Sequence, residues 1–326
     1  MKKFMKALMM MVFILVPLIT MSLIVQCGNT HENKTAEIKD VNEKKDAKPE
    51  ERKEIKDQPA KELEKAAQLK VKVRRKKAGF FLRNGQRPSK LTLIEELYFN
   101  EKGQRTKLIR YTATGGTDLV YQFAYDNSGK LISTEVYDNF GNLTTRRELE
   151  YDDGGNEINR RILTSRSVNE QKIVFLYDSL NHVVNEREYI GENLNTEKKY
   201  FYDGNMLAKV MGYNAKGNLV AEIDYVYNEE GYLIKEIQKA GSAVNEVVYN
   251  YDERGNLITV RNKQTVRQMN YDKNNNLIED KLFLSDGSRQ YRVTFSYYKN
   301  GLQHEEIRYA NDERPAYLAV YEYEFY

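Results

Sequence analysis

The sequence predicts an all-β fold: a long antiparallel meander of repeated hairpins, forming a ribbon or coiled sheet and preceded by a disordered tether. The first observation is composition, with 25 tyrosines, 5 prolines and no tryptophan in 326 residues. Tyrosine fits pleated, half-buried surfaces, and proline cannot donate to a strand ladder. The second is a motif of Tyr, Asp or Asn, two variable residues, Gly, one variable residue and Leu. The third is an apolar/polar alternation of period two between motif copies, typical of strands.

The amino terminus has the pattern of a secretory signal. Lys2, Lys3 and Lys6 form a basic head, and residues 7–25 form an apolar body interrupted by Pro17. Such a segment directs export and is removed from the mature protein. We therefore assign residues 1–26 to a signal peptide.

The end of this segment, Leu23-Ile24-Val25-Gln26-Cys27-Gly28, resembles the lipobox of bacterial lipoproteins. The resemblance implies cleavage before Cys27, lipidation of its thiol and further acylation by a fatty acid such as palmitate. Gln26 departs from the pattern, because the family usually has Gly, Ala or Ser there. The alternative is an uncleaved membrane anchor, since an apolar run of about 19 residues is just long enough to span a bilayer. Either reading places most of the chain in the cell envelope, with the outer membrane favoured over the inner.

Residues 27–78 are expected to form the lipidated start and a charged tether. Residues 28–78 are rich in Lys, Glu, Asp and Asn, and so little apolar surface does not offset the entropy of folding. Residues 61–68 have some helical character, and Arg74-Arg75-Lys76-Lys77 is interpreted as a solvated end of the linker.

The repeats occupy the predicted domain at 79–326. Successive copies that start at Tyr125, Tyr151, Tyr177 and Tyr202 are separated by 26, 26 and 25 residues, which corresponds to two strands and two turns per unit and predicts about 18 to 20 strands. The clearest copies contain Tyr125, Asp126, Gly129 and Leu131; Tyr137, Asp138, Gly141 and Leu143; Tyr213, Gly217 and Leu219; Tyr227, Gly231 and Leu233; and Tyr251, Asp252, Gly255 and Leu257.

Each copy is interpreted as a hairpin turn. The Asp or Asn side chain bonds the following backbone, and glycine supplies the left-handed conformation that closes a short loop with a bulge. This geometry makes Tyr and Leu cross-strand partners, an aromatic-aliphatic pair worth about 0.2–1 kcal/mol. The carboxy-terminal strand, with Glu322 and Glu324, is expected to be an exposed edge guarded by charge.

On these residues the array resembles the YD or RHS repeat family, whose members form long β-sheet ribbons that coil into spirals or shells. The resemblance implies the fold. It does not carry over the enclosed toxin of large family members, because this chain is short and lacks the toxin-junction motif.

The residues that would support catalysis or a cofactor are scarce, and we predict neither. Cys27 is the single cysteine, and the three histidines, His31, His182 and His304, form no known catalytic motif. A metal site at His304 and Glu305 is an alternative to a solvated strand residue, and calcium at the turn carboxylates is an alternative to their role in turn formation, which is favoured. A net charge of +3 gives no electrostatic reason to expect nucleic acid.

Two functions are consistent with the sequence. The first is a lipoprotein that displays a tyrosine-rich β-surface for adhesion to a protein, a glycan or the extracellular matrix. The alternative is a structural scaffold of the envelope without a soluble ligand.

Overall fold

The computed structural model describes residues 58–326, so the predicted signal peptide, Cys27 and residues 28–57 lie outside the described part of the chain. The described chain begins with helix α2 (Gln58–Gln68). The strands that follow are β1 (Val71–Phe80), β2 (Thr92–Phe99), β3 (Arg105–Tyr111), β4 (Thr117–Tyr125), β5 (Leu131–Tyr137), β6 (Leu143–Tyr151), β7 (Glu157–Thr164), β8 (Gln171–Tyr177), β9 (Val183–Ile190), β10 (Asn193–Asp203), β11 (Met206–Asn214), β12 (Leu219–Tyr227), β13 (Leu233–Ala240), β14 (Ala243–Tyr251), β15 (Leu257–Arg261), β16 (Thr265–Tyr271), β17 (Leu277–Leu284), β18 (Arg289–Tyr297), β19 (Gln303–Tyr309) and β20 (Pro315–Phe325).

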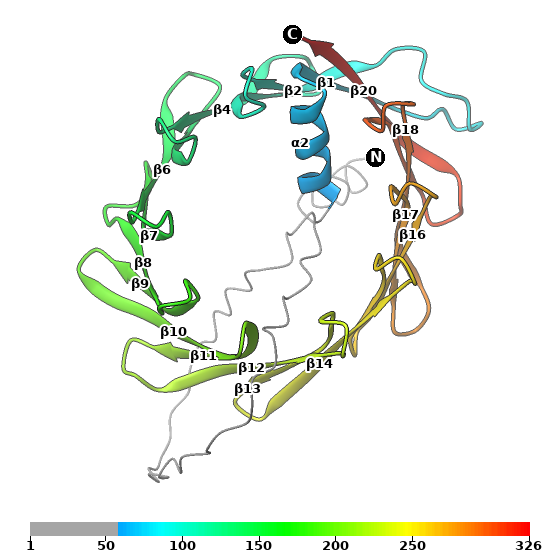
Figure 1. The fold of residues 1–326 in the computed structure, drawn as a ribbon. Coiled ribbons are helices and arrows are strands. Elements are labelled where there is room, and N and C mark those ends of the chain that lie inside the picture. Colours follow the sequence, from blue (N-terminus) through cyan, green and yellow to red (C-terminus); the bar gives the residue numbers. More distant parts are fainter. Residues whose placement is uncertain (1–57) are drawn as a thin grey trace. The chain divides into compact units, whose positions relative to one another are not determined.

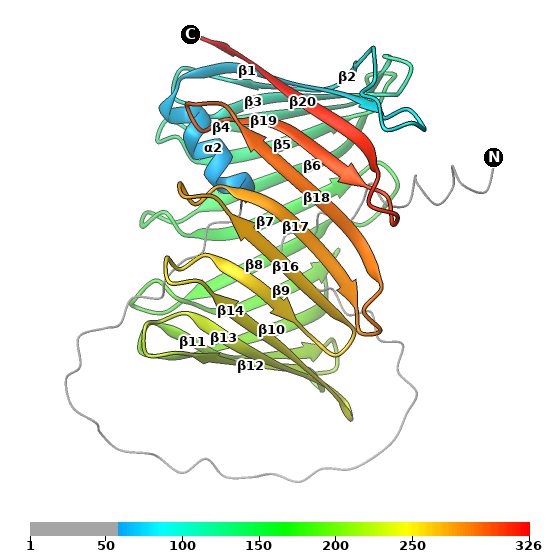
Figure 2. The same ribbon diagram turned by 90° about the vertical axis from the view of Figure 1, so that its right-hand side faces the viewer.

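The strands form one closed antiparallel sheet. Each strand pairs with the next along the chain, and β20 returns to pair with β1, which gives a 20-stranded ring (Figures 1 and 2). The predicted all-β meander of hairpins is confirmed, and the number of strands is at the upper end of the expected range. The sequence does not determine whether the sheet is open, coiled or closed. The pairing of β20 with β1 shows that it is closed.

The turns have the predicted register. Tyr125 lies opposite Leu131, and the strand has a bulge between Ala124 and Tyr125. Inside this turn the Gly129 N–H donates to the carbonyl of Asp126, and Gly129 has φ of 90°. The same Tyr–Leu pairing joins the other four clear copies: Tyr137 with Leu143, Tyr213 with Leu219, Tyr227 with Leu233, and Tyr251 with Leu257.

Two degenerate copies use asparagine where the motif has glycine. Asn181 and Asn275 have φ of 65° and 61°. Asparagine tolerates this left-handed conformation better than other residues with a side chain. The turn geometry therefore continues through copies that the motif matches poorly.

The two faces of the sheet can be assigned from α2, which lies inside the ring (Figure 1). Glu62 of α2 forms an ion pair with Arg74 of β1, so Arg74 points inward. Directly opposed residues in antiparallel strands share a face, and following the pairs around the ring assigns every other residue. Inward-facing residues include Tyr323, Tyr321 and Glu306 at the closure, and Arg147, Arg160 and Phe175 across the ring.

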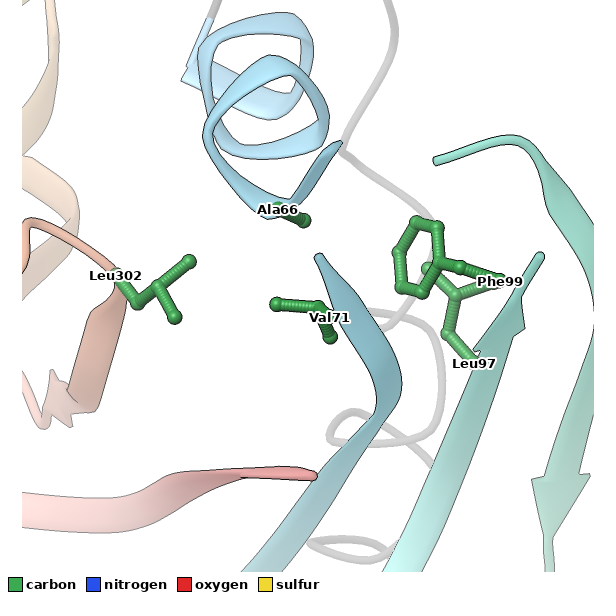
Figure 3. Packing of buried hydrophobic residues seen from close by; sticks show 5 residues of the cluster. All are labelled: Ala66, Val71, Leu97, Phe99 and Leu302. Carbon is green, nitrogen blue, oxygen red and sulfur yellow. The ribbon is translucent and has the colours of Figure 1, made fainter. Parts of the chain in front are cut away.

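The apolar core is concentrated where α2 meets the wall. Ala66 of α2 packs with Val71, Leu97, Phe99 and Leu302, all of which are buried (Figure 3). A second cluster contains Ala78, Ala319 and Tyr321. Away from this region exposure on the inner face varies, since Arg147 is exposed whereas Val210 and Tyr249 are buried. Eight strands are about the number whose interior side chains can fill, so a ring of this size is not packed by its own wall.

The predicted tether extended too far. Residues 58–68 form helix α2 and residues 71–80 form strand β1, so this part of the range 27–78 belongs to the folded domain. A short helix is marginal in isolation and is stabilised by tertiary packing. Here Leu63, Leu69 and Ala66 pack against the closing strands, which local composition did not reveal.

Two further expectations at the chain ends are corrected. The basic run 74–77 is not a solvated linker but the middle of β1, paired on both sides. The last strand is not an exposed edge, because β20 lies between β19 and β1. Both expectations were wrong for the same reason, because β1 and β20 pair with each other.

Candidate functional site

The most strongly coupled group of polar side chains lies on the inner face of the closure, where β1, β2, β19 and β20 meet α2. Arg74 bridges two carboxylates, with 2.7 Å to Glu95 and 3.3 Å to Glu62. Lys76 lies 2.9 Å from Glu306, which also accepts a 2.7 Å hydrogen bond from Arg308. We call these six residues the closure network. Its three carboxylates balance its three cations.

Tyrosine rings cover the closure network. The Tyr321 hydroxyl donates to Glu306 over 3.1 Å, and Lys76 lies 5.0 Å from the centre of the Tyr321 ring. Arg308 lies 5.2 Å from the ring of Tyr317. Aromatic faces attract cations, and more strongly when water is excluded. The network therefore joins the first strand, the last strand and the helix through groups that satisfy one another.

The electrostatics of the two central carboxylates differ. Burial would raise the pKa of Glu306, but Lys76 and Arg308 outweigh it and lower that pKa to about 2. Burial raises the pKa of Glu62 above its usual value, against the opposing effect of Arg74. Glu306 is thus held as a carboxylate by its two cations, which is the behaviour of a structural ion pair rather than of a proton-transfer group.

The outer face of the closure carries a second set of pairs, whose members are partly exposed except for the buried Glu96. Lys77 lies 2.8 Å from Glu322, and Arg75 lies 2.9 Å from Glu96 and 3.2 Å from Glu324. The basic run therefore alternates, with Arg74 and Lys76 inward and Arg75 and Lys77 outward. Each of these four cations meets a carboxylate of β2, β19, β20 or α2.

The motif tyrosines form a ladder that joins neighbouring hairpins. The Tyr151 hydroxyl donates 2.7 Å to the carbonyl of Leu131, the motif leucine of the preceding hairpin. Equivalent bonds run from Tyr177 to Glu157, Tyr202 to Val183, Tyr227 to Leu207, Tyr251 to Leu233, Tyr271 to Leu257, Tyr297 to Leu277 and Tyr323 to Gln303. The sequence predicted the Tyr–Leu pair but not this second role of the hydroxyl. The near-constant spacing of the tyrosines is the signal that could have revealed it.

Removing one hydroxyl of the tyrosine ladder should lower the stability of the domain by a small but measurable amount. We expect Tyr151→Phe to lower the free energy of unfolding by about 0.5–1.5 kcal/mol, because one hydrogen bond is lost and the carbonyl of Leu131 loses a partner. Tyr121→Phe is the control, since Tyr121 also faces inward but its hydroxyl has no hydrogen bond within residues 58–326. Urea unfolding followed by circular dichroism measures both variants. Equal losses would contradict a ladder.

The carboxylates of the turn aspartates accept hydrogen bonds from residues of the same turn. Asp138 Oδ1 accepts from the backbone N–H groups of Phe140 and Asn142, at 2.9 Å each. Asp126 Oδ1 accepts from the Lys130 N–H at 2.8 Å and from the Ser128 hydroxyl at 2.7 Å. Within the part of the chain that the structure describes, no three His, Cys, Asp or Glu side chains gather as metal ligands would.

Acid should weaken the domain through these turns. Hydrogen bonds from Ser128 and the Lys130 backbone lower the pKa of Asp126, and the Asn142 backbone foremost lowers that of Asp138. A depressed pKa contributes stability above the unfolded value of 3.8 that is lost as pH falls through the folded value. We therefore expect the melting temperature to fall below about pH 4.

The matched variant is Asp126→Asn with Asp138→Asn. Asn214 and Asn228 already make the same backbone bonds in other copies, so the double variant should fold at neutral pH and lose less stability between pH 5 and 2. Melting curves across that range test it, and an unchanged acid loss would assign the effect to other carboxyl groups.

The two described histidines have structural neighbours. His182 Nδ1 lies 3.1 Å from Asp178 Oδ2, and its ring stacks on Tyr202 at 4.5 Å. The ring of His304 lies 4.3 Å from that of Tyr298. The two histidines belong to different turns and strands, and neither contact pairs a histidine with a nucleophile.

The described residues include two shallow surface hollows. One, of about 460 Å³, lies between β6 and β7 and is lined by Leu143, Thr144, Thr145, Arg146, Glu148, Arg161, Leu163, Thr164 and Ser165. The other, of about 520 Å³, lies at two turns and is lined by Asn100, Glu101, Lys102, Gln104, Tyr125 and Asp126. Within residues 58–326, the one helix present is too short and too polar to cross a bilayer.

Comparison with known proteins relates this chain to YD shells. A family model described as the teneurin YD-shell matches residues 179–324. No curated protein sequence matches the chain.

Several solved structures are similar in part. A structure of the TcdB2-TccC3-TEV protein aligns at 14% identity over 69% of this chain and 15% of that chain, with a TM-score of 0.30. Porin-like proteins align from Bacteroides uniformis, at 9% identity over 78% of this chain and 98% of that one with a TM-score of 0.35, and from Bacteroides vulgatus, at 16% over 67% and 98% with a TM-score of 0.34. This chain thus spans about 15% of the length of the TcdB2-TccC3-TEV chain. With the family match, the observed hairpins describe an all-β domain built from YD-shell-like repeats.

Proposed function

We propose that this protein is a lipid-anchored protein of the cell envelope whose closed β-domain binds an extracellular protein, glycan or matrix component. The observation that carries the proposal is the inner wall of the ring, where Arg147 is exposed and Phe123 and Phe175 are half-buried. Ligand sites are usually concave and lined by apolar and aromatic side chains, with a few polar groups that fix the ligand's orientation.

Closure of the sheet limits how binding can occur. Each strand from β1 to β20 has a partner on both sides, so a ligand cannot extend the sheet by adding a strand at a free edge. Recognition must use side chains of the inner or outer face. The proposed binding role is therefore carried by the wall, and from the sequence we expect it to involve no catalysis, cofactor or nucleic acid.

The anchor is tested in cells. We expect radiolabelled palmitate to be incorporated into the wild-type protein but not into Cys27→Ala, and protease added to intact cells to degrade the wild type while sparing a periplasmic control protein. Protection of the wild type until the outer membrane is opened would overturn surface display. Equal palmitate incorporation by both proteins would overturn lipidation at Cys27.

Binding is tested with the full chain in detergent on arrays of envelope glycans and matrix proteins. We expect saturable binding to at least one class, and absence of binding to all of them would overturn the binding role.

The alternative is an envelope scaffold without a soluble ligand. The observation that favours it is the tyrosine ladder, in which the motif hydroxyls are engaged by backbone carbonyls and so contribute to the wall rather than to a contact surface. A scaffold is expected to crosslink to envelope components within intact cells.

A further inference from the structure

Two pairs of consecutive arginines lie on neighbouring strands and divide between the faces of the sheet. Arg146 and Arg147 are in β6, and Arg160 and Arg161 are in β7. Arg147 lies opposite Ile162 and Arg160 opposite Leu149, on the inner face. Arg146 and Arg161 point outward from the same strands.

The outer arginines are neutralised by carboxylates of adjacent strands or turns. Arg146 lies 2.7 Å from Glu135 of β5. Arg161 makes two hydrogen bonds to Glu170, of 2.6 and 3.1 Å. The outer member of each pair thus has an anionic partner.

The two inner arginines differ from each other, because only Arg160 has a carboxylate partner. Arg147 is exposed to the interior and has no ion pair within residues 58–326. Arg160 binds Glu157 through bonds of 2.7 and 3.0 Å and lies 5.4 Å from the ring centre of Phe175. Partial desolvation first, and repulsion from Arg160 second, lower the pKa of Arg147, as expected for a cation without a matching anion.

The surroundings of these cations are hydroxyl-bearing and aromatic. Thr134 lies directly opposite Arg147, and Thr145 opposite Thr164, all on the inner face. Farther along the wall Arg105 lies 4.9 Å from the ring of Phe123. The cationic region ends at β9, where Glu188 accepts hydrogen bonds from Gln171 and Thr196.

We propose that the inner face of β3–β8 binds an acidic oligosaccharide, whose carboxylate or sulfate groups contact Arg147 and Arg160. This deepens the proposed binding function and depends on it. Guanidinium groups bind oxyanions through paired hydrogen bonds, threonine hydroxyls suit sugar hydroxyls, and the rings of Phe123 and Phe175 provide apolar faces. Three strand spacings of ~4.8 Å make the wall from β5 to β8 about 14 Å wide, enough for a short oligosaccharide.

The test is titration calorimetry on the full chain in detergent at low and at physiological salt. The probes are a hyaluronan hexasaccharide, which carries carboxylates, a heparin hexasaccharide, which also carries sulfates, the neutral sugar maltohexaose, and a poly-glutamate peptide. The test variant is Arg147→Gln with Arg160→Gln. The control is Arg146→Gln with Arg161→Gln, which removes the same charge from the same two strands but on the outer face.

We expect an acidic hexasaccharide to bind, maltohexaose not to bind, and affinity to fall at least about tenfold in the inner variant. The outer variant should change affinity by less than about threefold, and added salt should weaken the binding. Circular dichroism and thermal melting establish that both variants are folded.

Three outcomes would overturn the inference: no binding of either acidic sugar, equal losses in the two variants, or stronger binding of poly-glutamate than of the sugars. The last would assign the wall to acidic peptides. If the calorimetry shows no binding of acidic sugars but the arrays show binding of another ligand, the proposed binding function still holds. If neither experiment shows binding, the proposed binding function is overturned.

Discussion

Replacing Glu306 by alanine is expected to lower the free energy of unfolding by about 3–5 kcal/mol, because Lys76 and Arg308 would then be left in the wall without their shared anion. The Glu306 side chain is only 8% exposed, so water cannot take its place at no cost. For a domain of this size the melting temperature should fall by roughly 10 °C. Differential scanning calorimetry of the full chain at pH 7 measures the change.

The control for this variant is Glu322→Ala, which lies on the outer face of the same closure. Its side chain is 46% exposed and pairs with Lys77, itself 35% exposed, and exposed pairs contribute about 0–1 kcal/mol. Glu306 should also behave differently in acid. Its pKa of about 2 lies below the usual 4.5, so its stabilising contribution is complete above the unfolded value and disappears as pH falls through the folded one. Similar losses of unfolding free energy in Glu306→Ala and Glu322→Ala would show that burial of the carboxylate does not determine its contribution to stability.

Replacing Gly103 by alanine is the second change with a large expected effect. Gly103 has φ of 76°, and an added Cβ would overlap the Cβ of Ala67 in helix α2. The left-handed conformation costs a residue with a side chain about 1–2 kcal/mol, and overpacking adds typically 1–3 kcal/mol. We expect a combined loss of about 2–5 kcal/mol, with faster amide hydrogen exchange in residues 58–68.

Gly115→Ala separates the two contributions. Gly115 has a similar φ of 89°, but an added Cβ would meet nothing within 4 Å. This variant should show the conformational cost alone and leave hydrogen exchange in α2 unchanged. If both alanine variants lose the same stability, the packing of α2 against the turn at Gly103 contributes little.

The hairpins could be predicted from the sequence because their determinants are local. Tyr125, Asp126, Gly129 and Leu131 lie within one turn, so the residues that form it are close together in the sequence. Asn181 shows the same locality, since a residue that tolerates the left-handed conformation preserved a turn without glycine.

The closure and the inner wall could not be predicted because their partners are far apart in sequence. Lys76 and Glu306 are separated by 230 residues, and a basic run read alone is indistinguishable from a solvated linker. The division of Arg146 and Arg147 between two faces depends on knowing which face is inside, and that follows from α2. The place of α2 depends in turn on Leu97 and Leu302, which no local pattern connects.

The pairing of β1 with β20 also sets an order of events during biosynthesis. Synthesis proceeds from the amino terminus, so β1 is available long before residues 315–325, which complete its second ladder. Bringing such distant segments together is entropically costly and slow compared with forming a hairpin. Until the last strand arrives, one side of β1 offers unpaired backbone groups to any other chain. Its consecutive cations at residues 74–77 repel a second copy of the same strand during that interval.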